Sequence, residues 1–488
     1  MSDQAADPHA TSTLPVKESP NTPTSLTGSR PSRGWSKTKL ALLSLGLLGP
    51  VAVGGLWIAV HSIPWMGPLV ANTLRSAIGK ENVTRLEDFV YAVEDRVNQT
   101  FKSGAAPRTY WKVPPKRAKA PVVAVIPTPS AATVTDAPLA DAPLPLTVFA
   151  PVDPGPAHDQ WAAEGDGQWV PMIDPRRPEE APRMFKTLLH ADSSRSWSEL
   201  FIVAVDLQKV AVMPVMGYQE PRSDKPEAQG YTRLAKIPPQ HYDALLAAFN
   251  GGFMAEHGEY GVFFDGITFL DAKDEACTLA AFKDGSYAVA SWTAMKARQA
   301  EMRWFRQAPS CMFENGLMHP YLKVQHAKKW GATLDGNTVI RRSAVGMSAD
   351  GKILYVGISN HTTAKVMAAG MHHAGAAHVA QMDVNWSYPK FVTYELGKEQ
   401  LLYPVALAEG FEFNDKLYLR ERSMRDFFYL ARQEEVQADL EAGDQKLKPS
   451  PSVPSNAALP PVAALPPVAP AIASEPRSTD VGKANKKP

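Results

Sequence analysis

The longest uncharged apolar run of the chain lies near its N-terminus. Leu40 to Val60 reads LALLSLGLLGPVAVGGLWIAV, which is long enough to cross a hydrocarbon core of roughly 30 Å. Two arginines and two lysines lie within the ten residues before it. Positive residues stay cytoplasmic, so we expect a retained anchor over 39–61, with the N-terminus inside and the main domain outside. A cleaved signal peptide is the competing interpretation, but the charged region is unusually long and no clean cleavage site follows.

A second pattern follows the anchor, within the juxtamembrane region 62–112. Apolar residues recur at helical spacing at Leu86, Phe89, Val90, Val93 and Val97. This spacing predicts an amphipathic helix. The helix could lie on the membrane surface, pack on the main domain or mediate oligomer contacts, and the pattern does not choose among these.

Strand and helix patterns alternate through 159–433, which we interpret as a single large mixed α+β domain. Strands are expected over 197–205, 206–218, 353–358 and 379–384, and helices over 239–248 and 363–376.

Composition sets the limits of this domain. Proline is abundant, with 43 residues gathered in a few stretches. Residues 113–158 are predicted to be a Pro/Ala-rich linker, and 1–38 and 434–488 to be disordered tails. Charge is balanced, with 51 Lys and Arg against 50 Asp and Glu, so no basic excess points to nucleic acid.

The chain has two cysteines, Cys277 and Cys311. Thiols outside the cytosol are usually oxidised, so the expected export predicts a Cys277–Cys311 disulfide. Two buried free thiols are the alternative.

Two glycine-bearing segments carry the first candidate site. AFNGGFMAEHGEYGVFFDG, residues 248–266, contains Asn250-Gly251-Gly252 and, later, Asp265-Gly266. Glycines there would permit positive φ and close approach of the backbone to a ligand. Two ordinary hairpin turns would explain the same residues.

The second candidate site lies in 341–387. Arg342 precedes a Gly-containing strand, and an Asp-Gly hairpin, a buried strand and a helix lead to a strand that ends at Asp383.

Together these segments resemble the phosphodiester glycosidase family, over roughly 190–432. Family members carry an apolar-Asn-Gly-Gly-Phe turn, matched by Phe249 to Phe253, and a later Asp-Gly, matched by Asp265-Gly266. An Arg before a small-apolar-Gly strand matches Arg342 to Gly346, and a final Glu-Arg before an apolar stretch matches Glu421-Arg422. The order of several weak motifs is more specific than any one of them.

One motif departs from the family. Its Asp-Gly-Gly-Gly-Ser turn is Asp383-Val384-Asn385-Trp386-Ser387 here. Val384 is β-branched and resists positive φ, whereas Trp386 offers a flat face on which a sugar ring could stack. The turn is therefore either adapted to another ligand or no longer catalytic.

The resemblance implies hydrolysis at a sugar anomeric carbon that bears a phosphodiester. Such cleavage usually employs two carboxylates, for which Asp383 and then Asp265 are the candidates. Arg342, or its neighbour Arg341, would bind phosphate. The other expected substrate-binding residues are Asn250, Gly251, Gly252, Asn360, His361, Asn385, Trp386 and Ser387. Each could instead serve a turn or a salt bridge.

No metal site is predicted, since His372, His373 and His378 do not share a helical face. No cofactor is predicted, and a Ca²⁺ or Mg²⁺ ion stays open. The expected partners are a glycan or sugar-phosphodiester substrate and the inner membrane of a Gram-negative cell, with the domain periplasmic. A catalytically inactive glycan-binding or scaffolding protein is the alternative.

Overall fold

The computed structural model describes residues 76–113, 149–323, 338–411 and 413–446, with positions 55, 70, 73, 74 and 330. The expected anchor lies outside these residues, apart from position 55, as do 1–38, 114–148 and 447–488. Within the described ranges, no helix combines the length and the apolar character that a membrane span needs. The chain divides into two compact units, Met1–Gly79 and Lys80–Pro488, and the following concerns the second.

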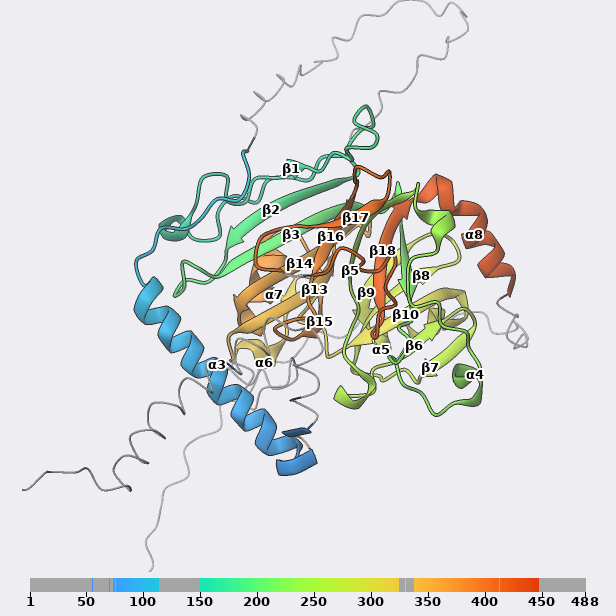
Figure 1. Ribbon diagram of the computed structural model, residues 1–488, viewed down its shortest axis with the longest axis horizontal. Helices are drawn as coiled ribbons and strands as arrows, with labels where there is room; N and C mark the ends of the chain where they lie inside the picture. The colour runs from blue at the N-terminus through green and yellow to red at the C-terminus, as the bar shows by residue number, and fades with distance from the viewer. Residues whose placement is uncertain are drawn as a thin grey trace, which may run out of the picture. The chain divides into compact units, whose positions relative to one another are not determined.

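Three antiparallel sheets form the domain (Figure 1). Sheet A has the order β1 (Val170–Pro171), β2 (Met184–His190), β3 (Glu199–Asp206), β14 (Ile353–Thr362), β13 (Ile340–Met347), β15 (His378–Val384), β11 (Phe313–Glu314) and β12 (Leu317–Met318). Sheet B has the order β17 (Leu402–Ala406), β16 (Phe391–Leu396), β5 (Leu245–Asn250), β18 (Phe427–Arg432) and β4 (Val210–Val215). Sheet C has the order β7 (Ile267–Leu270), β6 (Val262–Phe264), β10 (Met302–Ala308), β8 (Cys277–Phe282) and β9 (Tyr287–Ser291).

Helices are few among the described residues. The long ones are α3 (Lys80–Lys102), α7 (Ala364–His373) and α8 (Gln433–Lys446), and the short ones are α4 (Pro226–Gln229), α5 (Trp292–Met295) and α6 (Pro320–Lys323). Short 3₁₀ helices span 159–161, 239–241, 255–257 and 296–301. Thr363 caps α7 by accepting a hydrogen bond from the Val366 amide, as an N-cap residue does.

The core lies between the sheets, and the strands at its centre are buried on both faces. In β3, Phe201, Val203 and Val205 join the central cluster shared by the three sheets. The alternate residues of β3 pack with α7 on the other face of sheet A. Successive side chains of a strand point to opposite faces, so a strand with both faces covered is a continuous apolar run.

The expectation of a mixed α+β domain is met by this arrangement, and most predicted elements are present. β3, β14, α7 and β15 lie where strands or helices were expected, and α3 lies at the predicted amphipathic helix. The strand expected over 206–218 begins only at Val210, after a turn.

Two expectations need correction. Residues 239–248 were expected to be helical, but only 239–241 form a 3₁₀ turn and β5 begins at Leu245. The run LLAAFN is buried along its whole length, and apolar periodicity does not separate such a strand from a buried helix. The tail expected to be disordered from 434 begins instead with α8, which buries Val436 and Leu440 against sheet B.

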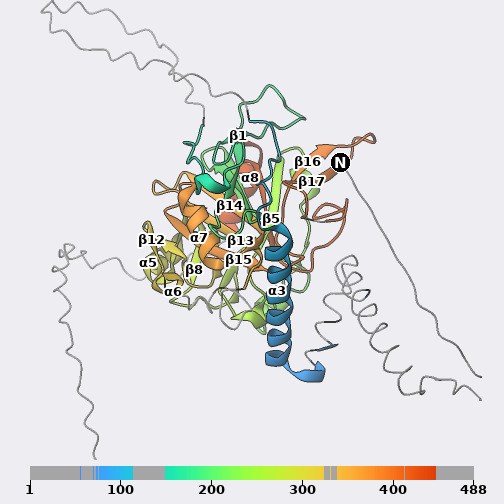
Figure 2. The same ribbon diagram turned by 90° about the vertical axis from the view of Figure 1, so that its left-hand side faces the viewer.

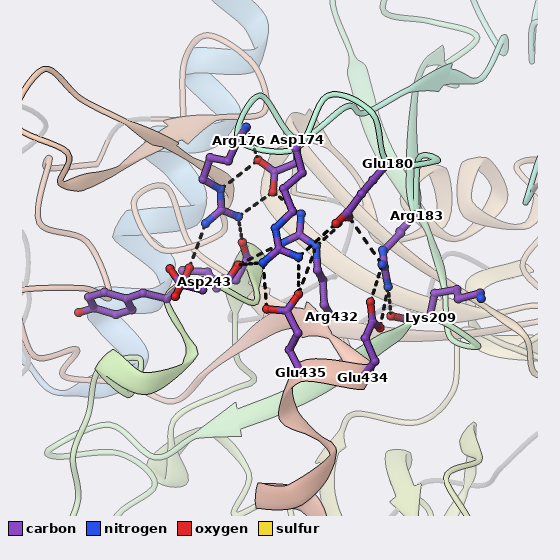
Figure 3. Close-up of polar contacts among 12 residues, drawn as sticks. Asp174, Arg176, Glu180, Arg183, Lys209, Asp243, Arg432, Glu434 and Glu435 are labelled. Carbon is purple, nitrogen blue, oxygen red and sulfur yellow. Dashed lines mark hydrogen bonds and ion pairs between the residues drawn. The ribbon is translucent and has the colours of Figure 1, made fainter.

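A buried ion-pair network joins the start of the domain to its end (Figure 3). Arg432, wholly buried, donates from Nη2 to Asp174 (2.6 Å) and from Nε to Glu180 (2.9 Å). A cavity of about 250 Å³ beside this network is lined by residues that include Asp174, Lys186 and Arg432.

Cys277 and Cys311 form a disulfide with Cα atoms 4.6 Å apart. Cys277 begins β8 of sheet C, and Cys311 lies in the segment that leads to β11 of sheet A. The bond therefore ties two sheets together.

Candidate functional site

Asp383 lies near the end of β15 and is almost wholly buried. Its Oδ2 forms an ion pair with Nη1 of Arg425 at 2.6 Å. Burial raises the pKa of Asp383 to about 6, although the charge of Arg425 opposes this shift. Burial disfavours a charged carboxylate, so Asp383 can hold or release a proton near neutral pH.

Asp426, the residue after Arg425, is the second carboxylate at this place. Its Oδ2 accepts a hydrogen bond from Nε of Arg306 at 2.9 Å, and both side chains are buried. Its negative charge contributes to the raised pKa of Asp383. Two carboxylates and two arginines thus form one buried cluster, which we call the Asp383 cluster (Arg306, Asp383, Arg425 and Asp426).

Tyr388 joins the altered turn to this cluster. Its hydroxyl donates to the Asp426 carbonyl at 2.5 Å. The guanidinium of Arg425 lies 4.0 Å from the centre of the Tyr388 ring. Such stacking holds a planar guanidinium in one orientation.

The Asn-Gly-Gly turn packs directly on the Asp383 cluster. A Cβ at position 251 would lie 2.3 Å from the Asp426 carbonyl oxygen, and one at position 252 would lie 2.8 Å from Cζ of Arg306. Neither glycine has positive φ, contrary to one of the two reasons expected for them. The glycines are required instead by close packing, because ionic residues of the protein itself occupy the space that a Cβ would fill.

Asn250, the last residue of β5, is linked to the same cluster by hydrogen bonds. Its Nδ2 donates to Oγ of Ser343 at 2.8 Å, and that Oγ donates to the Asp383 carbonyl at 3.0 Å. The Oδ1 atom accepts from the Lys390 amide at 3.1 Å. The side chain of Asn250 is therefore committed to holding the strand ends together.

The glycine-free turn after Asp383 has ordinary backbone geometry. Val384 is the last residue of β15 and has no positive φ, so the expected conflict with a β-branched residue does not arise. Oδ1 of Asn385 accepts from the amide and the hydroxyl of Ser387, both at 2.9 Å. This local closure is an Asx turn. Trp386 is half-buried beside it.

Lys390 adds a positive charge next to the cluster. Burial, with Arg341 and Arg425 as further causes, lowers the pKa of Lys390 to about 8. Its side chain is half-buried, and its ammonium group has no hydrogen-bond or ion-pair partner within the described ranges. A cation in such a place favours an anionic ligand.

Arg342, the arginine expected to bind phosphate, is wholly buried away from solvent. It donates to the carbonyls of Thr362 (3.1 Å), Thr338 (3.1 Å) and Trp330 (2.5 Å). Burial lowers the pKa of Arg342 to about 9. Arg341, on the other side of β13, is half-buried and donates to the Gly410 carbonyl.

Three other expected residues, Asp265, Asn360 and His361, form no hydrogen bond or ion pair with the Asp383 cluster within the described ranges. Asp265 and Gly266 both have positive φ, of 51° and 79°, and form the two-residue turn between β6 and β7. Asn360 and His361 belong to β14. Burial, followed by Lys102 and Arg341, lowers the pKa of His361 to about 4, so this imidazole is neutral near pH 7.

An apolar rim and α3 cover one side of the site. Phe253, Ile340 and Val384 form a buried cluster on which Tyr260 and Tyr91 of α3 pack. Burial raises the pKa of Tyr91. The site is closed in this conformation, since Asp383 is 2% exposed.

The sequence analysis missed Arg306, Lys390, Arg425 and Asp426. The family's final motif was placed on Glu421-Arg422, whereas the residues at the site are Arg425-Asp426, immediately before β18. A charged pair directly before the apolar run Phe427 to Ala431 was the available signal. No group of three His, Cys, Asp or Glu residues in the described part of the chain could hold a metal ion.

Comparisons with known proteins find similarity in structure only. No family model matches the chain, and no curated protein matches its sequence. The chain is similar to the catalytic domain of zebrafish N-acetylglucosamine-1-phosphodiester alpha-N-acetylglucosaminidase, auto-inhibited by its pro-peptide, with a TM-score of 0.33 and 14% identity over 54% of this chain and 88% of that chain.

Two further solved structures are similar to parts of the chain. A hypothetical protein from Synechocystis has a TM-score of 0.30 and 8% identity over 52% of this chain and 64% of that chain. A protein of Burkholderia pseudomallei K96243, described as exported, has a TM-score of 0.27 and 12% identity over 48% of this chain and 74% of that chain.

Proposed function

We propose that the chain is a membrane-anchored, periplasmic glycosidase that hydrolyses a sugar-1-phosphodiester or a related envelope glycan linkage. One observation carries the proposal: Asp383, with its pKa raised to about 6, meets Arg425 and a second carboxylate beneath the Asn-Gly-Gly turn. Perturbed carboxylates gathered with cations are typical of catalytic sites.

Asp383 is the proton carrier in this proposal. Its pKa lies near the operating pH, which suits a group that protonates a leaving oxygen or accepts a proton from water. Arg425 and Lys390 would bind the phosphodiester, since Arg425 presents a planar fork of donors and Lys390 a mobile charge. Asp426 would be a positioning residue, because Arg306 holds it in place.

Binding would have to displace part of the rim. Asp383 is buried, and Phe253 and Tyr91 pack beside it. We therefore expect substrate to enter by moving side chains of the rim or of α3.

The alternative is a glycan-binding or scaffolding protein without turnover. The observation that favours it is the self-contained turn, in which Asn385 and Ser387 bond to each other. In that case binding would depend on Trp386.

The test is turnover by the full chain on a panel of sugar-1-phosphodiesters, with and without Ca²⁺ or Mg²⁺. Asp383→Asn should abolish release of free sugar, a loss of about 100-fold or more for a general acid–base group. Asp265→Asn is the matched control, because Asp265 lies in the hairpin turn, and it should keep turnover. If the folded chain binds glycan but turns over no substrate, the enzyme proposal is wrong and the chain is a glycan-binding protein.

A further inference from the structure

Helix α3 exposes a continuous apolar face. The members of this α3 stripe are large apolar residues with relative exposures between 37% and 81%, and they are Leu86, Phe89, Val90, Val93, Val97 and Phe101. None of them belongs to a buried apolar cluster formed by the described residues. Contiguous exposed apolar surface commonly marks an interaction site.

The opposite face of α3 is already in use. Tyr91 packs on the apolar rim of the site, and Oδ1 of Asp88 accepts from Thr338 at 3.1 Å. Asp95 forms an ion pair with Arg195 at 2.7 Å. These contacts fix the rotation of the helix about its axis, so the α3 stripe lies on the face turned away from them. Figure 2 shows the ribbon of α3, in blue, running along the domain.

The spacing within the α3 stripe is that of a coiled-coil seam. Leu86, Val90, Val93 and Val97 follow one another at intervals of four, three and four residues. This is the alternation of a and d positions, with Val90 and Val97 at a and Leu86 and Val93 at d. β-Branched residues at a with leucine at d favour two-stranded parallel association; here both a positions are valine and one of the two d positions, Leu86, is leucine.

The charges of α3 do not suit a lipid surface. The helix has four basic and five acidic residues, whereas helices that lie on membranes have a polar face rich in Lys and Arg. A protein partner therefore fits the α3 stripe better than an anionic bilayer does.

Charges at the two edges of the α3 stripe favour a parallel copy. On an α-helix at 3.6 residues per turn, Arg85 and Arg96 fall along one edge, and Glu87 and Glu94 along the other. In a parallel pair, the basic edge of one helix faces the acidic edge of its partner. In an antiparallel pair, edges of like charge would meet, which is unfavourable.

We infer that the α3 stripe is the interface for a second copy of this chain, joined as a parallel pair of α3 helices. The proposal rests on the helix alone and is independent of the proposed activity. It selects oligomer contact among the roles open to the amphipathic helix, while the opposite face serves domain packing.

Cysteine cross-linking in the full chain tests the pairing. The two native cysteines are joined in a disulfide, so an introduced cysteine is the sole thiol. We would make Leu86→Cys, Val90→Cys, Val93→Cys and Val97→Cys separately, treat each with a short bis-maleimide and measure the dimer yield. In a parallel pair every one of these residues meets its own copy, so all four should cross-link several times better than the exposed control Ala92→Cys.

A second variant tests the seam itself. Adding Val93→Asp to Val90→Cys should reduce cross-linking to the level of Ala92→Cys, because a buried charge opposes association. Equal yields at all five cysteine positions would overturn the proposal. Cross-linking at only one seam position would indicate an antiparallel crossing and would also overturn it.

Discussion

Two buried arginines of this domain, Arg342 and Arg425, occupy different chemical settings. Arg342 donates to three backbone carbonyls and has no carboxylate partner within the described residues. Arg425 forms an ion pair with Asp383 and stacks on Tyr388. The first arginine binds main-chain carbonyls beside sheet A, and the second opposes the rise that burial causes in the pKa of Asp383. Burial alone therefore does not distinguish these two arginines, whereas their hydrogen-bond and ion-pair partners do.

The largest effect should come from removing the cation of the Asp383 pair. Arg425→Met leaves a buried carboxylate without its partner, which costs about 3–5 kcal/mol of stability. Sugar release should be lost as well. Urea unfolding measures the first effect. The double variant Arg425→Met with Asp383→Asn should recover part of the stability, and no recovery would mean that the pair is not coupled.

The next largest effect is a pH dependence of stability, whose direction follows from the raised pKa of Asp383. Its pKa rises from an ordinary 3.8 to about 6 on folding, so the folded state binds the proton more tightly. The resulting stability is fully present below pH 4 and is lost as the pH rises through about 6. Relative to Asp383→Asn, the wild type should lose about 3 kcal/mol between these limits. Equal pH profiles of the two proteins in urea unfolding would contradict this assignment.

Substitution of Arg342 should lower the stability by a smaller amount and should leave the activity unchanged. Arg342→Met leaves buried carbonyls without donors, which costs about 1–3 kcal/mol. The kcat/KM of the folded protein should stay unchanged, because Arg342 is not placed at Asp383. Loss of activity by a folded Arg342→Met variant would mean that Arg342 contributes to activity as Arg425 does.

Lys390 should give the smallest effect, because an ion contact between its half-buried ammonium and a bound phosphodiester contributes less than about 1 kcal/mol to the free energy of binding. The KM of the wild type should rise as the pH passes about 8, where the ammonium of Lys390 loses its proton. Lys390→Arg keeps its charge, so its KM should not rise over this range. Parallel KM profiles would remove Lys390 from phosphate binding.

Much of the fold could be predicted from the sequence, because β3, β14, α7 and β15 have distinct apolar patterns. β5 could not, since its buried run LLAAFN contains no β-branched residue, whereas the runs of β3 and β14 do. The same limit applies to the site. Arg341 and Arg342 are adjacent on β13, and a strand sends neighbours to opposite faces, but the sequence does not say which face holds the site.

The other members of the Asp383 cluster could not be predicted, because the cluster is assembled from three different sheets. Asp383 lies next to the last residue of a strand of sheet A, whereas Arg425 and Asp426 precede a strand of sheet B, and Arg306 lies on sheet C. Their contacts depend on how three sheets pack, which no local motif specifies. The Asn-Gly-Gly turn was found because its glycines are required for close packing.

The Cys277–Cys311 disulfide affects the half-life of the folded protein as well as the folding equilibrium. It spans 34 residues and holds the segment that enters sheet A against sheet C. Separation of these sheets is then a rare event, and loss of the protein by aggregation or proteolysis is governed by the rate at which it occurs. Under reducing conditions the chain should keep its fold at first but have a shorter half-life on heating, so its endurance would depend on the redox state of its compartment.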